Sequence, residues 1–370
     1  MAEQLKNMLN KEHLQNLAQD IKAVYTPFQS KDFITSTMDE TWENLELKAR
    51  MRQITLNLGK YLPQDYASAI NIIDDVIKHD GNWKESFCLY FPDFVEVFGQ
   101  DEKNWDISIA ALERYTIYAS AEFAVRPFII NHEKRMMAQM QTWATHENEH
   151  VRRLSSEGCR PALPWANALP KFKKDPTPIF PILEQLKSDN DLYVKKSVAN
   201  NLNDISKTHP DLVAKIAKDW YGKNENTNWI VKHGCRTLLK KGNSDVLAIF
   251  GFNHAASISV DNFALQTKTV TIGSELNFSF EIAVNNASKV RLEYGIDFVK
   301  SNGKRNRKIF QISEISMKEN EKKVYTKTHS FADLSTRKHY VGVHSVVLVV
   351  NGVERGGVDF EVVGVIGSRS

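Results

Sequence analysis

With 370 residues, 42% of them hydrophobic and 10% aromatic, the chain is long enough to bury a large core, and we expect two domains. The formal net charge is +3, and the three cysteines are far apart with no Cys-x-x-Cys pair, which argues against a disulfide framework and a cysteine zinc site. The N-terminus carries charges where a signal peptide needs an apolar segment, and no apolar run is long enough to span a membrane. We therefore expect a cytosolic protein without a membrane partner.

The first part of the chain is predicted to be helical. Apolar residues recur every three or four positions in segments 14–24, 45–58 and 66–77, which is the spacing of amphipathic helices. Segment 104–130 is again strongly apolar, and the methionines between 136 and 140 are predicted core residues. These segments are expected to act mainly as scaffold.

A repeated phrase organises the middle of the chain. Val-Arg-Arg at 151–153, Val-Lys-Lys at 194–196 and Val-Lys-His at 231–233 are spaced by 43 and 37 residues, the period of two-helix repeats of the HEAT type. Such repeats stack into a solenoid with a continuous surface. Segment 149–243 contains 17 Lys and Arg against 10 Asp and Glu, so its net charge is +7 while the remainder carries −4. This local excess predicts a polyanionic partner.

The last part of the chain is predicted to be a β-domain. From residue 257 onward, apolar and polar residues alternate in runs separated by turn signals such as Ser301-Asn302-Gly303 and Asn351-Gly352. Roughly seven strands in about 110 residues fit a small immunoglobulin-like sandwich. The predicted architecture is therefore multidomain, α then β: an α-helical HEAT-like-repeat solenoid over residues 1–252, followed by an immunoglobulin-like β-sandwich over residues 256–370.

Three carboxylates are predicted to lie within the basic surroundings. On a helix, residues four apart share a face, and this spacing pairs Glu122 with Arg126 and Arg153 with Glu157, while Asp204 ends a polar stripe of the next repeat. A solvated salt bridge explains any single pair. However, acids along a groove that only grips phosphates would repel the ligand, so their recurrence indicates a reactive centre.

The segment after Glu157 adds further candidates. Gly158 can end a helix, and the prolines that follow stiffen the chain, which would hold Arg160 and Trp165 beside the carboxylate. A buried core position fits Trp165 equally well. Asn200 lies one turn before Asp204 and is a candidate substrate contact, although such residues more often lie on a helix surface.

A competing motif is His-Glu-Asn-Glu-His at 146–150, which matches the H-E-x-x-H pattern of zinc metalloproteases. In that pattern two histidines on one helical face bind zinc. The longer form with a further Gly and His fails, because Arg153 and Ser156 occupy those positions. We therefore keep a zinc protease only as a remote alternative and expect no metal.

The phrase His-Val-Arg-Arg-Leu-Ser-Ser-Glu-Gly-Cys-Arg-Pro-Ala-Leu-Pro-Trp at 150–165, with Ser-Val-Ala-Asn-Asn-Leu-Asn-Asp-Ile at 197–205, closely resembles the AlkC branch of bacterial HEAT-like-repeat DNA glycosylases. The likeness covers about residues 1–250, and some members of this family add a C-terminal immunoglobulin-like domain. The resemblance implies a monofunctional glycosylase that removes cationic N3-methylated bases, 3-methyladenine and 3-methylcytosine, from alkylated DNA and so starts base excision repair. The family's acidic site positions correspond to Glu122, Glu157 and Asp204.

The resemblance fits chemistry that needs no cofactor. A base methylated at N3 is already cationic and leaves as a neutral molecule, so the carboxylates only have to stabilise the sugar cation and orient a water. Arg160, Asn200 and the π face of Trp165 are the expected substrate contacts.

Double-stranded DNA with alkylated bases is the expected partner of a monomer that needs no other protein. A DNA-binding HEAT-repeat protein without catalytic activity is the alternative. The predicted DNA contacts are Arg126, Arg152, Arg153, Lys195, Lys196, Lys232, His233, Arg236, Lys304, Arg305 and Arg307, of which the last three lie on a basic turn of the β-domain together with Lys308.

Overall fold

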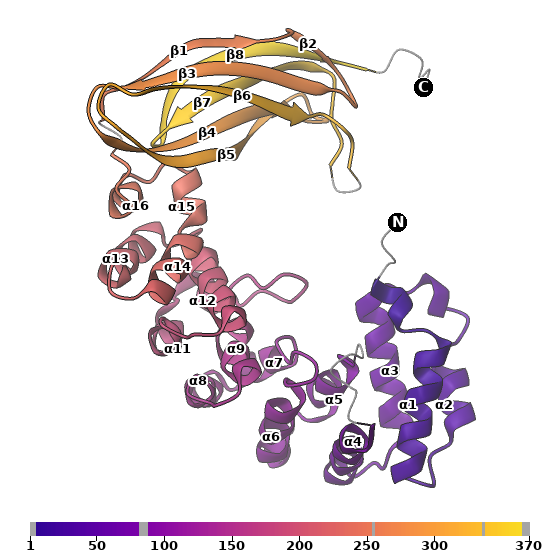
Figure 1. Cartoon of the computed structure of the whole chain (residues 1–370). Helices are drawn as coiled ribbons and strands as arrows, with labels where there is room; N and C mark the ends of the chain where they lie inside the picture. Colours follow the sequence, from indigo (N-terminus) through magenta and orange to yellow (C-terminus); the bar gives the residue numbers. More distant parts are fainter. Residues whose placement is uncertain (1–4, 81–87, 254–255, 335–336, 365–370) are drawn as a thin grey trace. The chain divides into compact units, whose positions relative to one another are not determined.

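The computed structural model describes residues 5–80, 88–253, 256–334 and 337–364. Within these residues sixteen α-helices precede eight β-strands, which confirms the predicted fold class (Figure 1). The helices are α1 (Lys11–Val24), α2 (Ser30–Thr37), α3 (Leu47–Tyr61), α4 (Tyr66–Asp80), α5 (Tyr90–Phe98), α6 (Trp105–Tyr115), α7 (Val125–Asn131), α8 (Glu133–Trp143), α9 (Glu149–Gly158), α10 (Pro170–Lys174), α11 (Phe180–Leu186), α12 (Leu192–Ile205), α13 (Pro210–Trp220), α14 (Glu225–Gly234), α15 (Arg236–Lys240) and α16 (Ser244–Ile249). Short 3-10 helices are η1 (Leu5–Met8), η2 (Trp42–Asn44), η3 (Glu102–Asn104) and η4 (Thr177–Ile179).

The described residues form two compact units. The first contains α1 to α12 together with α14, and the second contains α13, α15, α16 and all eight strands. None of the described helices has the length and hydropathy needed to cross a bilayer.

The repeat helices α9, α12 and α14 pack side by side in the first unit. Side chains of Asn148 and Asp191 accept hydrogen bonds from backbone N–H groups in the first turns of α9 and α12, and Asn224 does the same for α14. These caps fix where each helix begins. The repeat phrase starts at the third residue of α9 and of α12 but at the seventh residue of α14. The third copy of the phrase therefore lies about one turn further along its helix than the first two, and its predicted equivalence to them is wrong.

Apolar residues on facing sides hold the repeat helices together. Val151 and Leu154 of α9 are buried, as are Val194, Val198 and Leu202 of α12. Burial of each such side chain stabilises the fold by about 1.5–3 kcal/mol. The last residue of α9, Gly158, packs tightly against α7. A Cβ at this position would lie 2.5 Å from a methyl carbon of Val125 in α7.

The eight strands form two sheets. One sheet has the order β1-β3-β6, and the other has the order β2-β8-β7-β4-β5, with β2 pairing parallel to β8. The prediction of roughly seven strands missed one, and the three-residue β2 is too short to produce a recognisable alternation. The strands are β1 (Ile258–Leu265), β2 (Thr269–Thr271), β3 (Glu275–Val284), β4 (Ser288–Val299), β5 (Arg305–Met317), β6 (Lys322–Ser330), β7 (Gly342–Val350) and β8 (Val353–Val363).

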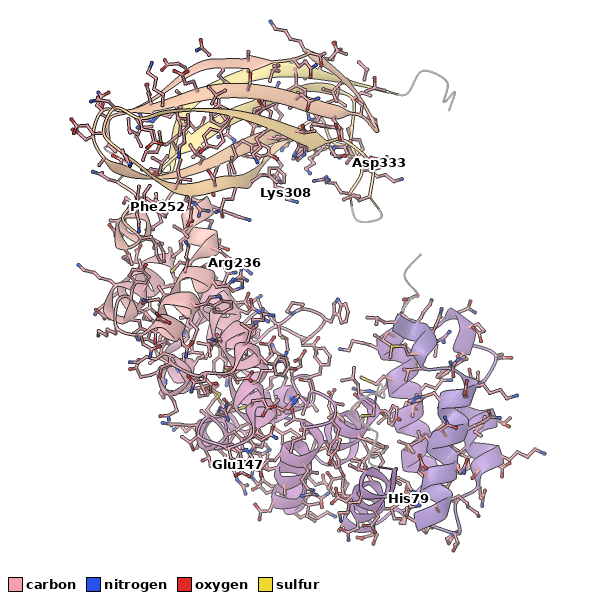
Figure 2. The ribbon with its side chains drawn as sticks, viewed as in Figure 1. His79, Glu147, Arg236, Phe252, Lys308 and Asp333 are labelled. Carbon is pink, nitrogen blue, oxygen red and sulfur yellow. The ribbon has the colours of Figure 1, made fainter. Side chains whose placement is uncertain are left out.

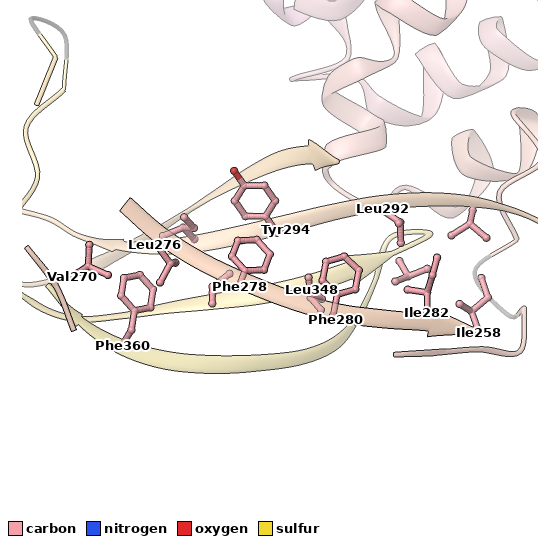
Figure 3. Close-up of a cluster of buried hydrophobic side chains, with 14 of the residues drawn as sticks. Ile258, Val270, Leu276, Phe278, Phe280, Ile282, Leu292, Tyr294, Leu348 and Phe360 are labelled. Atoms are coloured by element: carbon pink, nitrogen blue, oxygen red, sulfur yellow. The ribbon is translucent and has the colours of Figure 1, made fainter. Parts of the chain in front are cut away.

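The sandwich core lies between the two sheets (Figure 3). Alternate residues of β3, including Phe278, Phe280 and Ile282, are buried, as the period of two predicts. By contrast, β7, which lies between β4 and β8 in its sheet, is buried on both faces over most of its length. The Asn351-Gly352 turn joins β7 to β8 with positive φ at both residues, the backbone that a two-residue hairpin turn of this type requires.

The sandwich is joined to the helices of its own unit by close backbone contacts. A Cβ on Gly242 would lie 2.9 Å from the carbonyl oxygen of Gly352, and both residues have positive φ, so glycine is required on each side of this contact. The side-chain amide of Asn351 also donates to the carbonyl of Asn253, just after Phe252 (labelled in Figure 2). The predicted domain boundary at residues 252–256 lies between α16 and β1. The division of the chain into these two domains stays a prediction.

Candidate active site

Two buried carboxylates lie on either side of one arginine in the first unit. Glu157, near the end of α9, accepts a hydrogen bond from Arg160 Nη1 at Oε1 (2.5 Å), and Asp204, near the end of α12, accepts one from Arg160 Nε at Oδ2 (2.9 Å). The two acids are only 4% and 5% exposed, and Arg160 is 7% exposed. Burial lowers the pKa of Arg160, but Glu157 and Asp204 outweigh it and hold this pKa above its usual value.

The third predicted carboxylate joins the same group through a second arginine. Arg153 Nη1 lies 2.5 Å from Glu122 Oε2, and its Nη2 lies 3.5 Å from Glu157 Oε1. Lys207 Nζ contacts Asp204 Oδ1 at 2.9 Å. The three carboxylates are therefore matched by three cations, which is the condition for keeping charges out of water.

One predicted pair is not formed. Glu122 lies in the turn before α7, where helical spacing does not apply, and it pairs with Arg153 instead of Arg126. The predicted Arg153–Glu157 pair is present. The structure therefore brings all three predicted carboxylates into one network, by a different set of contacts.

The carboxylates differ in how many oxygens the protein occupies. Asp204 uses both, since Lys207 contacts Oδ1 and Arg160 contacts Oδ2. Both arginine contacts to Glu157 go to Oε1, so within the described part of the chain Oε2 has no protein partner. Glu157 therefore keeps Oε2 available for a further hydrogen bond, whereas both oxygens of Asp204 are already engaged.

Arg126 has a structural role where a DNA contact was predicted. It is 2% exposed, and its guanidinium donates to the carbonyls of Gly158, Arg160 and Asn167. Burial lowers its pKa to about 10. A buried guanidinium held by backbone oxygens cannot reach a phosphate, so this predicted contact is wrong.

Trp165 is not a core residue. Its side chain is 69% exposed, and its φ of 63° places the backbone in the left-handed region, which costs a residue other than glycine about 1 kcal/mol or more. Lys48 Nζ donates to its carbonyl at 2.8 Å. Asn200 is half-buried on α12. Of the three predicted substrate contacts, Arg160 lies within the carboxylate network.

The predicted cations of the repeats divide into internal and exposed groups. Arg152 binds Asp189 at 2.7 Å and the carbonyls of His146 and Glu147, and its DNA contact stays a prediction. Lys195 donates to Asn226 of α14.

The remaining predicted cations of this region lie nearer the surface. Lys196 and Lys232 are exposed, and the ring of His233 stacks on Trp229 at 5.0 Å. Arg236 lies on α15, whereas His233 lies on α14.

The basic turn of the β-domain is partly neutralised. Arg307 binds Asp297 and Glu354, and hydrogen bonding to Asp297 is the main cause that holds its pKa above the usual value. Arg305 donates to Ser345 and lies 3.8 Å from Asp359. Lys304 is exposed, and Lys308 (labelled in Figure 2) extends over the ring of Phe310. Lys304 and Lys308 are therefore the more available cations.

The H-E-x-x-H motif lacks its required geometry. His146 lies in the turn before α9, where its Nδ1 accepts from the N–H of Asn148, and only His150 is in the helix. The two rings therefore do not share one helical face. Within the described residues no three His, Cys, Asp or Glu side chains are grouped as metal ligands.

Sequence reasoning missed several neighbours of the network. Lys207 follows Asp204 by three residues, so helical spacing could have identified it. Ser120, which binds Glu122 and Arg153, and Tyr193, whose ring lies 4.5 Å from the Arg153 guanidinium, come from other segments and leave no local signal.

Comparison with known proteins identifies the family. Residues 100–238 match the family model described as "DNA alkylation repair enzyme", and residues 259–364 match the model of the C-terminal Ig-like domain of the uncharacterised protein YhaZ. The chain is 47% identical to YhaZ of Bacillus subtilis (strain 168), over 97% of this chain and 99% of that protein. The Pseudomonas fluorescens alkylpurine DNA glycosylase AlkC, solved bound to DNA containing an abasic site analog, is 34% identical with a TM-score of 0.92, over 97% of this chain and 99% of that one. The chain belongs to the AlkC-type DNA alkylation repair enzymes.

The part of this AlkC-type chain that matches the repair-enzyme model contains the whole carboxylate network. Glu122, Glu157, Asp204 and the arginines between them all lie inside residues 100–238. The network is thus part of the region that defines the family.

Proposed function

We propose that this chain is a monofunctional DNA glycosylase that hydrolyses the N-glycosidic bond of cationic N3-methylated bases, 3-methyladenine and 3-methylcytosine, and so starts base excision repair. The observation that carries this proposal is the pair of buried carboxylates, Glu157 and Asp204, held on either side of Arg160. The likeness to AlkC, an alkylpurine DNA glycosylase, supports it. We expect the enzyme to act as a monomer in the cytosol, without a protein partner.

The proposed substrate requires no general acid. A base that already carries a positive charge leaves as a neutral molecule, so its departure needs no proton. The sugar becomes cationic as the bond breaks, and fixed carboxylates stabilise that charge far better in a water-poor site than in bulk solvent. Exposed Trp165 can offer its π face to the cationic base and so favour it over normal bases.

The three acids receive different roles. Glu157 orients the attacking water through Oε2, as glycosidase carboxylates do. Asp204, whose oxygens are both occupied, stabilises the developing sugar cation by its charge. Glu122 holds Arg153 in place, and Arg153 in turn contacts Glu157 and fixes its position.

Release of a free base is the test of this function. The purified protein is expected to release 3-methyladenine from alkylated duplex DNA, and to do so fully in the presence of a metal chelator, because no step uses a metal. His146→Ala should excise at the wild-type rate and serves as the matched control. Duplex binding without any base release would favour a DNA-binding protein without catalytic activity. Activity that is lost on removal of stoichiometric zinc would instead restore the H-E-x-x-H interpretation.

We further propose that the β-domain contributes cations to DNA binding. Lys304 and Lys308 are the available ones, because Arg305 and Arg307 already contact carboxylates. Each phosphate neutralised adds about −0.9 to the slope of log K against log salt, so replacing both lysines by Ala should flatten that slope by roughly 1 to 2 units.

Ala at Arg305 and Arg307 should change the salt slope less, and this double variant is the matched comparison. Single-turnover excision from bound substrate should change little in either variant, because every proposed carboxylate lies before residue 250. An unchanged slope in the Lys304 and Lys308 variant would assign the domain another role.

A further inference from the structure

The loop between α9 and α10 presents Trp165 to solvent in an unfavourable conformation. Its indole is 69% exposed, and its backbone lies in the left-handed region. Such a conformation persists only where the surroundings determine it, and it is most often found at functional sites. The contacts that maintain it are therefore of interest for the reaction.

The ends of this loop are held by Arg126. From α7, its guanidinium donates to Gly158 and Arg160 at 2.9 and 3.1 Å on one side, and to Asn167 at 2.8 Å on the other. Within the loop, the N–H of Leu169 donates to the carbonyl of Pro161 at 3.1 Å. Arg126 thus closes the loop at its base.

The tip of the loop is held from a distant part of the chain. Lys48, in the first turn of α3, donates to the carbonyl of Trp165 at 2.8 Å, and its ammonium lies 4.4 Å from the ring centroid of Phe123. Phe123 directly follows Glu122 in the turn before α7. One ammonium group therefore contacts both the segment that carries Glu122 and the loop that carries Trp165.

We propose that Lys48 and Arg126 are positioning residues of the reaction: together they fix the 158–167 loop so that Trp165 stays presented to the substrate and Arg160 stays between Glu157 and Asp204. This inference rests on the proposed function. The proposal assigns neither residue a contact with the reacting base. Arg126 acts through the carbonyls that flank Arg160, and Lys48 acts through the backbone of Trp165.

A role limited to general stability would have other consequences. Lys48 is exposed, and a hydrogen bond from an exposed ammonium adds little to the stability of a fold. Its loss should therefore leave the unfolding midpoint nearly unchanged while it frees the loop. A change in the loop and in the chemistry, without a change in stability, separates positioning from stabilisation.

The experiment compares Lys48→Met with Lys60→Met, which removes an exposed ammonium from the other end of the same helix. The readout is quenching of the Trp165 fluorescence by acrylamide, a neutral quencher that does not respond to the lost charge. The Trp165 signal is the difference in fluorescence between each protein and its Trp165→Phe derivative. Lys48→Met is expected to change this quenching and to lower single-turnover excision by at least about threefold, with DNA binding maintained. Lys60→Met should change neither, and Lys48→Arg, which keeps a donor, should recover part of both.

Arg126→Lys provides the second variant. It keeps the charge but cannot bind three carbonyls in a fork, so excision should fall by about tenfold while the pH profile shifts through the loosened Arg160. Wild-type quenching and excision in Lys48→Met would overturn the proposal. If the wild-type protein releases no base, the proposed function is refuted. The quenching comparison needs no substrate, so it still tests whether Lys48 fixes the loop that carries Trp165.

Discussion

Glu157→Gln is expected to lower single-turnover excision by at least about tenfold, which corresponds to roughly 1.4 kcal/mol of barrier. The amide keeps the shape of the side chain but removes the charge that orients water and stabilises the sugar cation. Asp204→Asn should have an effect of at least the same size. DNA affinity should hold or rise in both variants, because a neutral amide no longer repels phosphate.

The burial of these acids requires a control for stability. Removing one partner from a buried ion pair destabilises a protein by about 3–5 kcal/mol, since the other charge stays buried without compensation. Asp189→Asn is the matched variant: it disrupts the Arg152–Asp189 pair, which connects α9 to the turn before α12 and lies outside the carboxylate network. Thermal unfolding should reveal losses in all three variants, while single-turnover excision falls only in the first two. Wild-type excision by both Glu157→Gln and Asp204→Asn would show that the carboxylates are structural.

Local spacing predicted the parts of this site that lie on single helices. Arg153 and Glu157 form their pair because both are in α9, where residues four apart meet. The same rule failed for Glu122, because α7 begins three residues after it. Periodicity identifies helices, but the residue at which a helix begins depends on caps and turns that the spacing alone does not reveal.

Contacts between distant segments could not be derived from spacing. Arg160 and Asp204 are 44 residues apart, and they meet because α9 packs against α12. The repeat period predicted that these helices stack, but the facing residues depend on the details of packing. Whether Trp165 was buried stayed open for the same reason, since Lys48, 117 residues away, contacts its backbone.

The β-sandwich is expected to lose stability as the pH falls below about 6.5. Three buried histidines, His329, His339 and His344, surround the rings of Phe298 and Phe331 in its core. One nitrogen of each imidazole is buried without a hydrogen-bond partner. A proton on that nitrogen would be both desolvated and unpaired, so the folded state disfavours protonation of all three rings.

The charged groups around these rings reinforce this effect. Burial, followed by Arg337, His339 and Lys308, lowers the pKa of His329 to about 4. Burial is also the main cause of the lowered pKa of His339; Lys300 lowers this pKa further, whereas Asp333 raises it. The pKa of His344 is likewise lowered mainly by burial, with a contribution from Arg305. Lys308 and Asp333 lie on the same side of the sandwich (Figure 2). The surroundings are thus mostly cationic, and a single carboxylate does not offset them.

The sign of the pH dependence follows from these lowered values. A histidine with a folded pKa below its unfolded value of about 6.5 takes up its proton first in the unfolded state, so stability present above that pH is lost as the pH falls toward 4. For His329 alone the full loss is about 3 kcal/mol, a large fraction of the stability of a small domain. Hydrogen exchange of the strand amides between pH 7.5 and 4.5, corrected for intrinsic rates, measures this loss within the sandwich. His329→Gln should weaken the dependence on pH, whereas His79→Gln on α4, where the ring is 51% exposed, should leave it unchanged. Protection of the strands that stays constant down to pH 4.5 would show that the cluster accommodates protons, and that its buried nitrogens gain partners on protonation.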